Sequence, residues 1–165
     1  MLVSRLKGPP YDIELVRAAD GRGHEAKLVI GADEDAYLIT LLVCRLEPLS
    51  IGAKKHWEFS FEIHASYVDK AKENLQTQDA KIAADIIPPE ARRYIMDAVC
   101  ASLRLLVVRV KPRLMYAATR AARFTKKTLL KYHTAIKVLE DLGYVMERKG
   151  TDRSGRRFWT MRRSR

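Results

Sequence analysis

The chain has 165 residues, of which 47% are hydrophobic, and this is enough for one domain with a single core. It contains no uncharged apolar run of about 18 residues, so no membrane-spanning helix is predicted. The net charge of +11 arises in the C-terminal part, because residues 104–165 hold 18 Lys and Arg residues against four acidic residues. Such a cationic half attracts polyanions or an acidic partner, and the alternative is an ordinary solvated surface rich in arginine.

The two cysteines, Cys44 and Cys100, both lie in apolar stretches. Such positions favour buried free thiols over a disulfide, and free thiols are typical of a reducing compartment. The N-terminal residues are too few and too polar for a signal peptide. The histidines and cysteines do not fall at metal-ligand spacing, so no metal site is predicted. We therefore expect a cytoplasmic protein.

Four antiparallel strands are predicted within residues 1–67. Residues 11–16 and 26–30 are the first two, and residues 36–46 are apolar on both faces, which is typical of a central strand. Residues 55–67 alternate strictly between apolar and polar. The apolar row, expected in the core, is Trp57, Phe59, Phe61 and Ile63, and the polar row, expected to face solvent, is Glu58, Ser60, Glu62 and His64.

Residues 68–111 are predicted to be helical. The longest helix is expected to begin at Pro88-Pro89-Glu90, because prolines are tolerated in a first turn and an acidic residue there suits the helix dipole. Apolar residues then recur at helical spacing as far as Val110. Pro112 ends this helix.

Residues 112–165 are predicted to form a strand, a helix and a basic hairpin. Residues 113–119 read as a short buried strand, although their alanines also permit a helix. Thr125 can cap the next helix, and Gly143 can end it. The turn-rich segment 150–157 then joins two strands.

This order of elements defines the predicted fold class. A strand–helix–strand connection of such length implies a parallel pair with a right-handed crossover. We therefore predict a mixed α/β (α+β) fold with a mostly antiparallel sheet and one parallel crossover, in a single domain spanning residues 1–165.

The last predicted helix ends in residues 138–144, VLEDLGY. This segment is similar to the L-Y-E-K-L-G-F segment of the GNAT superfamily of N-acetyltransferases. The order of elements over residues 36–161 also resembles the later two-thirds of that fold. The resemblance implies an acyl-CoA N-acetyltransferase-like fold, an acetyl-CoA cofactor and a general-base glutamate on the strand that matches residues 55–67. If the protein is an acyltransferase, Glu58 and Glu62 are the candidates for that base.

Two features of the family are missing. Its members bind the acetyl-CoA pyrophosphate on a glycine-rich loop that exposes backbone N–H groups at a helix N-terminus. Here no glycine occurs between Gly52 and Gly143. Pro88 and Pro89 also remove two N–H groups where that loop would lie. The tyrosine that protonates the leaving thiolate in the family aligns with Leu139, which cannot act as an acid. We therefore predict a GNAT-like but non-catalytic binding protein without a cofactor, and a divergent acetyl-CoA-dependent N-acetyltransferase is the alternative.

The C-terminal cations are the predicted binding residues for an acidic macromolecule such as nucleic acid. They are Lys126, Lys127, Arg153, Arg156, Arg157, Arg162 and Arg163, which we expect to form one continuous patch. Cations on one face give salt-dependent, sequence-tolerant binding. The neighbouring Phe158 and Trp159 either stack on a base or pack the core of the last strand. A helix before an arginine-tipped hairpin also resembles a winged-helix DNA-binding unit, which would require a helix within residues 115–124.

Overall fold

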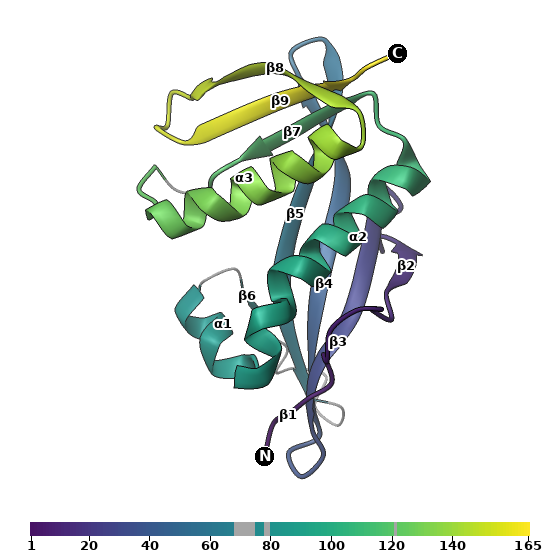
Figure 1. Ribbon diagram of the computed structural model, residues 1–165, viewed down its shortest axis with the longest axis vertical. Coiled ribbons are helices and arrows are strands. Elements are labelled where there is room, and N and C mark those ends of the chain that lie inside the picture. Colours follow the sequence, from purple (N-terminus) through teal and green to yellow (C-terminus); the bar gives the residue numbers. More distant parts are fainter. Residues whose placement is uncertain (68–74, 78–79, 121) are drawn as a thin grey trace. The chain divides into compact units, whose positions relative to one another are not determined.

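The computed structural model describes residues 1–67, 75–77, 80–120 and 122–165 (Figure 1). The strands are β1 (Val3–Ser4), β2 (Glu14–Arg17), β3 (His24–Asp33), β4 (Leu38–Ile51), β5 (Lys54–Tyr67), β6 (Leu75–Thr77), β7 (Leu114–Ala118), β8 (Tyr144–Thr151) and β9 (Arg157–Arg163). The helices are α1 (Ala80–Ile86), the 3-10 helix η1 (Pro89–Tyr94), α2 (Ile95–Val110) and α3 (Lys126–Asp141).

The strands pair in the order β1-β3-β4-β5-β7-β9-β8, with β2 on β3 and β6 on β5. The β5–β7 pair is parallel, whereas β1–β3, β5–β6, β7–β9 and β8–β9 are antiparallel. The predicted mixed class, a mostly antiparallel sheet with a parallel pair, is confirmed. The contacts divide the chain into two units. Unit 1 comprises residues 1–16, 25–44 and 61–102, and unit 2 comprises residues 17–24, 45–60 and 103–165.

Unit 1 has a core formed by strands β3 and β4 and the first half of α2. Its fully buried side chains include Ile30, Leu42 and Val99. Cys44 and Cys100 are buried thiols, as predicted, and burial raises the pKa of the Cys44 thiol to about 12.

The first predicted strand, residues 11–16, begins later in the structure, because β2 starts only at Glu14. Tyr11, which we expected inside that strand, instead donates a hydrogen bond from its hydroxyl to the Asp97 carboxylate on α2. A side-chain bond to a residue so far away in the sequence leaves no trace in the local alternation.

The segment predicted as helical differs in two places. Leu75–Thr77 forms strand β6, with Thr77 opposite Ile63 of β5, while residues 68–74 and 78–79 lie outside the described residues. The long helix also begins with the 3-10 turn η1, and α2 follows only from Ile95. Pro88 packs so closely on Gly31 that a Cβ there would lie 2.6 Å from Pro88 Cγ.

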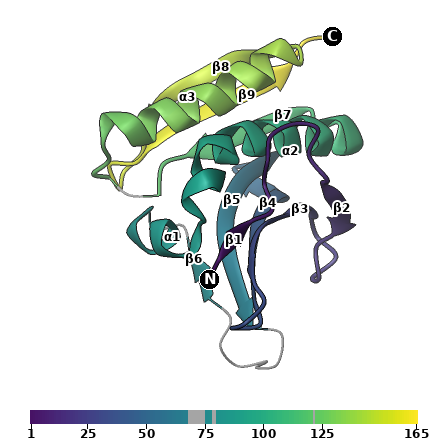
Figure 2. The same cartoon turned by 60° about the horizontal axis from the view of Figure 1, so that its bottom comes forward.

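Unit 2 contains a three-stranded sheet of β7, β9 and β8, here called the C-terminal sheet. The first strand, β7, confirms the predicted strand at residues 113–119 and pairs parallel with β5, with Met115 opposite Trp57. Helix α3 lies along one face of this sheet (Figures 1 and 2). Trp159 of β9 is buried beneath α3, and its ring stacks on that of Tyr132 at 5.6 Å between centroids.

Helix α3 begins and ends where the sequence predicts. Thr125 Oγ1 accepts a hydrogen bond from the Thr128 N–H at 3.1 Å, which satisfies one of the unpaired donors of the first turn. Gly143 follows the helix with a φ of +87°, a conformation that favours glycine. None of the helices within the described residues is long and apolar enough to cross a membrane.

We expect Thr125→Ala to lower the free energy of unfolding by about 1 kcal/mol, because the alanine cannot accept the Thr128 N–H. Thr125→Ser keeps the hydroxyl and should stay close to the parent protein. Urea denaturation followed by far-UV circular dichroism measures both variants, and equal losses for alanine and serine would show that the cap contributes nothing.

Candidate functional site

The loop before α3 and the turn between β8 and β9 lie together at one end of unit 2 (Figures 1 and 2). The Thr119 N–H donates to the Arg157 carbonyl at 2.8 Å, and the Arg157 N–H donates to Thr119 Oγ1 at 3.0 Å. A Cβ on Gly155 would lie 3.0 Å from the Ala122 Cβ. Cations from the loop, from the start of α3 and from the turn therefore share one region. We call them the tip cluster: Arg120, Arg123, Lys126, Lys127, Arg153, Arg156 and Arg157.

Arg162 and Arg163 lie at the opposite end of β9. Arg163 is opposite Tyr144, and its N–H donates to the Arg113 carbonyl at 3.0 Å. Arg163 lies six positions after Arg157, which is about 20 Å along an extended strand. The predicted continuous patch is therefore two clusters, and we call Arg113, Arg162 and Arg163, all exposed, the base cluster.

Two of the predicted cations are held by carboxylates. Arg156 Nε lies 2.9 Å from Asp152 Oδ2, and Arg162 Nε lies 3.6 Å from Glu147 Oε1. Asp152 also accepts the N–H groups of Ser154 and Arg156, so it organises the turn, and these hydrogen bonds hold the pKa of its carboxyl below the usual range. Among the described residues, the remaining predicted cations form no ion pair; they are Lys126, Lys127, Arg153, Arg157 and Arg163. Their charge remains available to a ligand.

Glu58 lines a cavity of about 340 Å³ in unit 2, together with Ala118, Thr119, Arg120 and Arg156. It lies where the parallel pairing of β5 with β7 stops, since it is opposite Tyr116 in the second of two matched pairs. The cavity thus holds one carboxylate and two guanidinium groups from the tip cluster.

The Glu58 carboxyl has a raised pKa. Burial is the main cause, and the charge of Glu47 adds to it, whereas Arg156 and Arg120 oppose it. The pKa values of two nearby phenols, Tyr116 and Tyr132, are also raised, mainly by burial and partly by the charge of Glu58. A carboxyl whose folded pKa exceeds its unfolded value costs stability when it is ionised.

We expect Glu58→Gln to raise the melting temperature at about pH 8 by about 2 °C, because it removes this ionised, half-buried carboxylate. The gain should shrink as the pH falls through the folded pKa of Glu58 towards the ordinary pKa of a glutamate, since the native carboxyl then takes up a proton and its ionisation no longer costs stability. Differential scanning calorimetry across this range measures the effect. The exposed Glu140→Gln is the matched control, and a pH-independent gain at Glu58 would contradict the assignment.

Glu62, the second candidate base, belongs to unit 1 and does not line this cavity. Its Oε1 lies 2.7 Å from His64 Nε2, with only 13% and 15% of the two side chains accessible. The prediction that the polar row of β5 faces solvent is therefore wrong. The prediction that its apolar row is core holds only in part, since Ile63 is buried but Trp57 is half-exposed. Both faces of β5 are partly covered, so the alternation of apolar and polar residues is not matched by an alternation of buried and exposed side chains.

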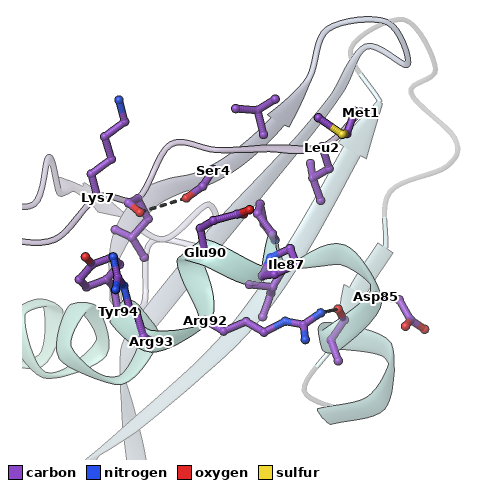
Figure 3. Close-up of a pocket in the computed structure, with 15 residues that line it drawn as sticks. Met1, Leu2, Ser4, Lys7, Asp85, Ile87, Glu90, Arg92, Arg93 and Tyr94 are labelled. Carbon is purple, nitrogen blue, oxygen red and sulfur yellow. Dashed lines mark hydrogen bonds between the residues drawn. The ribbon is translucent and has the colours of Figure 1, made fainter.

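Unit 1 contains a larger pocket, about 810 Å³, between the N-terminal residues and the segment that leads into α2 (Figure 3). Its lining mixes charges, with Glu90 beside Arg92 and Arg93. Arg92 is already engaged, because its Nη2 donates to the Ala84 carbonyl at 2.6 Å, and the Arg93 guanidinium lies 4.6 Å from the centre of the Tyr94 ring. This mixed lining does not select for an anion.

Backbone N–H groups at the entrance to α2 are engaged within the chain. The Ile87 N–H donates to the Ala83 carbonyl at 3.0 Å, and the Ala91 N–H donates to the Pro88 carbonyl at 2.9 Å. These amides lie in the region where the GNAT resemblance would place the pyrophosphate, and Pro88 and Pro89 have no N–H to offer.

Within the described ranges, no three His, Cys, Asp or Glu side chains lie close enough together to hold a metal ion. Comparison of the chain with protein-family models, with curated proteins and with solved structures found no match.

Proposed function

We propose that the protein binds a polyanion, nucleic acid, through the exposed cations of unit 2. The tip and base clusters support this proposal most, because five predicted cations in them have no ion pair among the described residues. A protein that neutralises phosphates with Lys and Arg gains affinity from released counterions, so unpaired exposed cations are the groups that such binding requires.

We propose that the protein has a GNAT-like fold but does not transfer acetyl groups. Two observations support it: strand β7 follows α2 and lies parallel to β5, and α3 with the β8–β9 hairpin completes the expected order. The engaged amides before α2 argue against a pyrophosphate cradle of the family type. Strand Leu114–Ala118 argues against the winged-helix alternative, because that fold needs a helix there.

One observation favours the acyltransferase as a second candidate. Glu58 is a half-buried carboxylate with a raised pKa in a cavity, as a general base on this strand would be. Isothermal titration with acetyl-CoA separates the two candidates. The non-catalytic proposal expects no heat of binding, and micromolar binding would favour the acyltransferase.

Fluorescence anisotropy with a labelled single-stranded oligonucleotide of about 12 nucleotides tests the polyanion proposal. At about 50 mM salt we expect a Kd on the order of micromolar. A peptide nucleic acid of the same sequence, which has an uncharged backbone, is the matched control and should not bind. Equal binding of the charged and uncharged strands, or no binding of either, would overturn the proposal.

A further inference from the structure

The face of the C-terminal sheet turned away from α3 carries aromatic and cationic side chains. Side chains alternate along β9, and Trp159 and Met161 are buried, Trp159 against α3. Phe158, between Arg157 and Trp159, therefore points to the other face, which we call the open face. There it is opposite Ala118 of β7 and Gly150 of β8.

Three side chains form a row across the open face, one from each strand. The Tyr116 and Phe158 rings stack with 6.4 Å between centroids and an interplanar angle of 18°. The Arg148 guanidinium carbon lies 5.4 Å from the centre of the Phe158 ring. A Cβ on Gly150 would come within 3.3 Å of that ring, so the absence of a side chain there lets the phenyl group lie across β8.

The row is accessible. Tyr116 and Phe158 are half-buried, Arg148 and Arg162 are exposed, and Val145 on the same face is 45% exposed. Since Trp159 supplies the aromatic packing beneath α3, the ring of Phe158 is not required there.

Arginines flank the two rings on the open face. Arg148 of β8 lies over the Phe158 ring, and Arg162 of the base cluster has the same parity along β9 as Phe158, so it points to the same face. Burial raises the pKa of Tyr116, and the charge of Arg156 opposes that rise, so a guanidinium of the tip cluster acts on the phenol. A nucleic-acid strand whose phosphates contact both clusters would carry its bases across the row of Tyr116, Phe158 and Arg148.

We propose that the open face binds single-stranded nucleic acid by stacking bases on Tyr116 and Phe158, with arginines on either side contacting phosphates. This inference rests on the proposed function and adds the class of nucleic acid and the mode of binding. Aromatic rings with flanking cations suit unpaired bases, because a base in a duplex has its faces covered by its neighbours. Stacking is tolerant of sequence, so the site should distinguish a strand with bases from one without bases, but should not distinguish one base from another.

The test compares two strands of equal length and charge, one of about 12 thymidines and one of abasic sugars, by fluorescence anisotropy. The wild-type protein should bind the thymidine strand at least about fivefold more tightly, since each stacked base contributes on the order of a factor of five or more. Phe158→Leu and Tyr116→Leu should each reduce this preference and leave the affinity for the abasic strand unchanged. Phe158→Tyr keeps a stacking ring and should retain the preference.

Tyr37→Leu is the matched control, because Tyr37 is a 60% exposed aromatic residue in unit 1. It should change neither affinity. Equal binding of both strands by the wild-type protein would overturn the stacking inference and leave the polyanion proposal standing, whereas failure of both strands to bind would overturn both. If both leucine variants keep the preference for the thymidine strand and their far-UV circular dichroism is unchanged, the open face is excluded as the site of stacking.

Discussion

Replacing Trp159 with alanine should lower the free energy of unfolding by about 3–5 kcal/mol. Trp159 is only 6% exposed. Its ring stacks on Tyr132 at an interplanar angle of 19° and meets the edge of His133 at 6.0 Å, so it joins α3 to the C-terminal sheet. Truncation would leave a cavity beneath the helix that the surrounding backbone can only partly close. Because domains are stable by only about 5–15 kcal/mol, this is a large fraction of the total.

Urea denaturation followed by far-UV circular dichroism measures this loss. Phe158→Leu is the neighbouring control, because Phe158 lies on the open face and should cost less than half as much as Trp159→Ala. Similar losses at the two positions, or a loss at Trp159 below about 1 kcal/mol, would mean that the ring does not hold α3 in place.

Reversing three charges of the tip cluster should weaken binding to a single-stranded oligonucleotide on the order of 100-fold or more at about 50 mM salt. The variant combines Lys127→Glu, Arg153→Glu and Arg157→Glu, which are exposed cations without an ion pair among the described residues. Arg156 is left unchanged, because it pairs with Asp152 and its loss would disturb the turn. Each reversal removes one phosphate contact and adds one repulsion.

A matched variant changes the net charge equally but in unit 1. It combines Lys7→Glu, Lys81→Glu and Arg93→Glu, all exposed positions outside unit 2. The affinity of this control should fall by much less than that of the tip variant. Equal losses of affinity in the two variants would mean that affinity follows the overall charge of the protein and that the binding site is not at the tip cluster.

The elements that could be predicted from the sequence are those with local causes. Thr125 and Gly143 mark the two ends of α3 because capping and positive φ are properties of single residues. The β8–β9 hairpin and the strand at 113–119 were likewise predicted from their own residues, and the parallel pairing of β7 follows from the length of the connection.

The parts that could not be predicted depend on residues far apart in the chain. The strict alternation of β5 predicted one exposed face, but tertiary contacts cover Glu62 and His64. The row of Tyr116, Phe158 and Arg148 requires the register of three strands. A bulge between Met146 and Arg148 shifts that register, and no local pattern in β8 reveals it.

The candidate site shows the same division. The sequence predicted five of the seven tip cations and missed Arg120 and Arg123. The spacing of six positions along an extended strand already separates Arg157 from Arg163. It did not predict that Arg156 and Arg120 meet Glu58 in a cavity, because that depends on the pairing of β5 with β7.

The salt dependence of oligonucleotide affinity tests the central claim most directly. If the tip and base clusters contact phosphates, log K should fall linearly with log salt concentration, with a slope steeper than about −2 for the wild-type protein. In the tip variant the slope should become shallower by about two, because three contacts are lost at about 0.7 each. A wild-type slope near zero, or a slope that the tip variant leaves unchanged, would contradict the account.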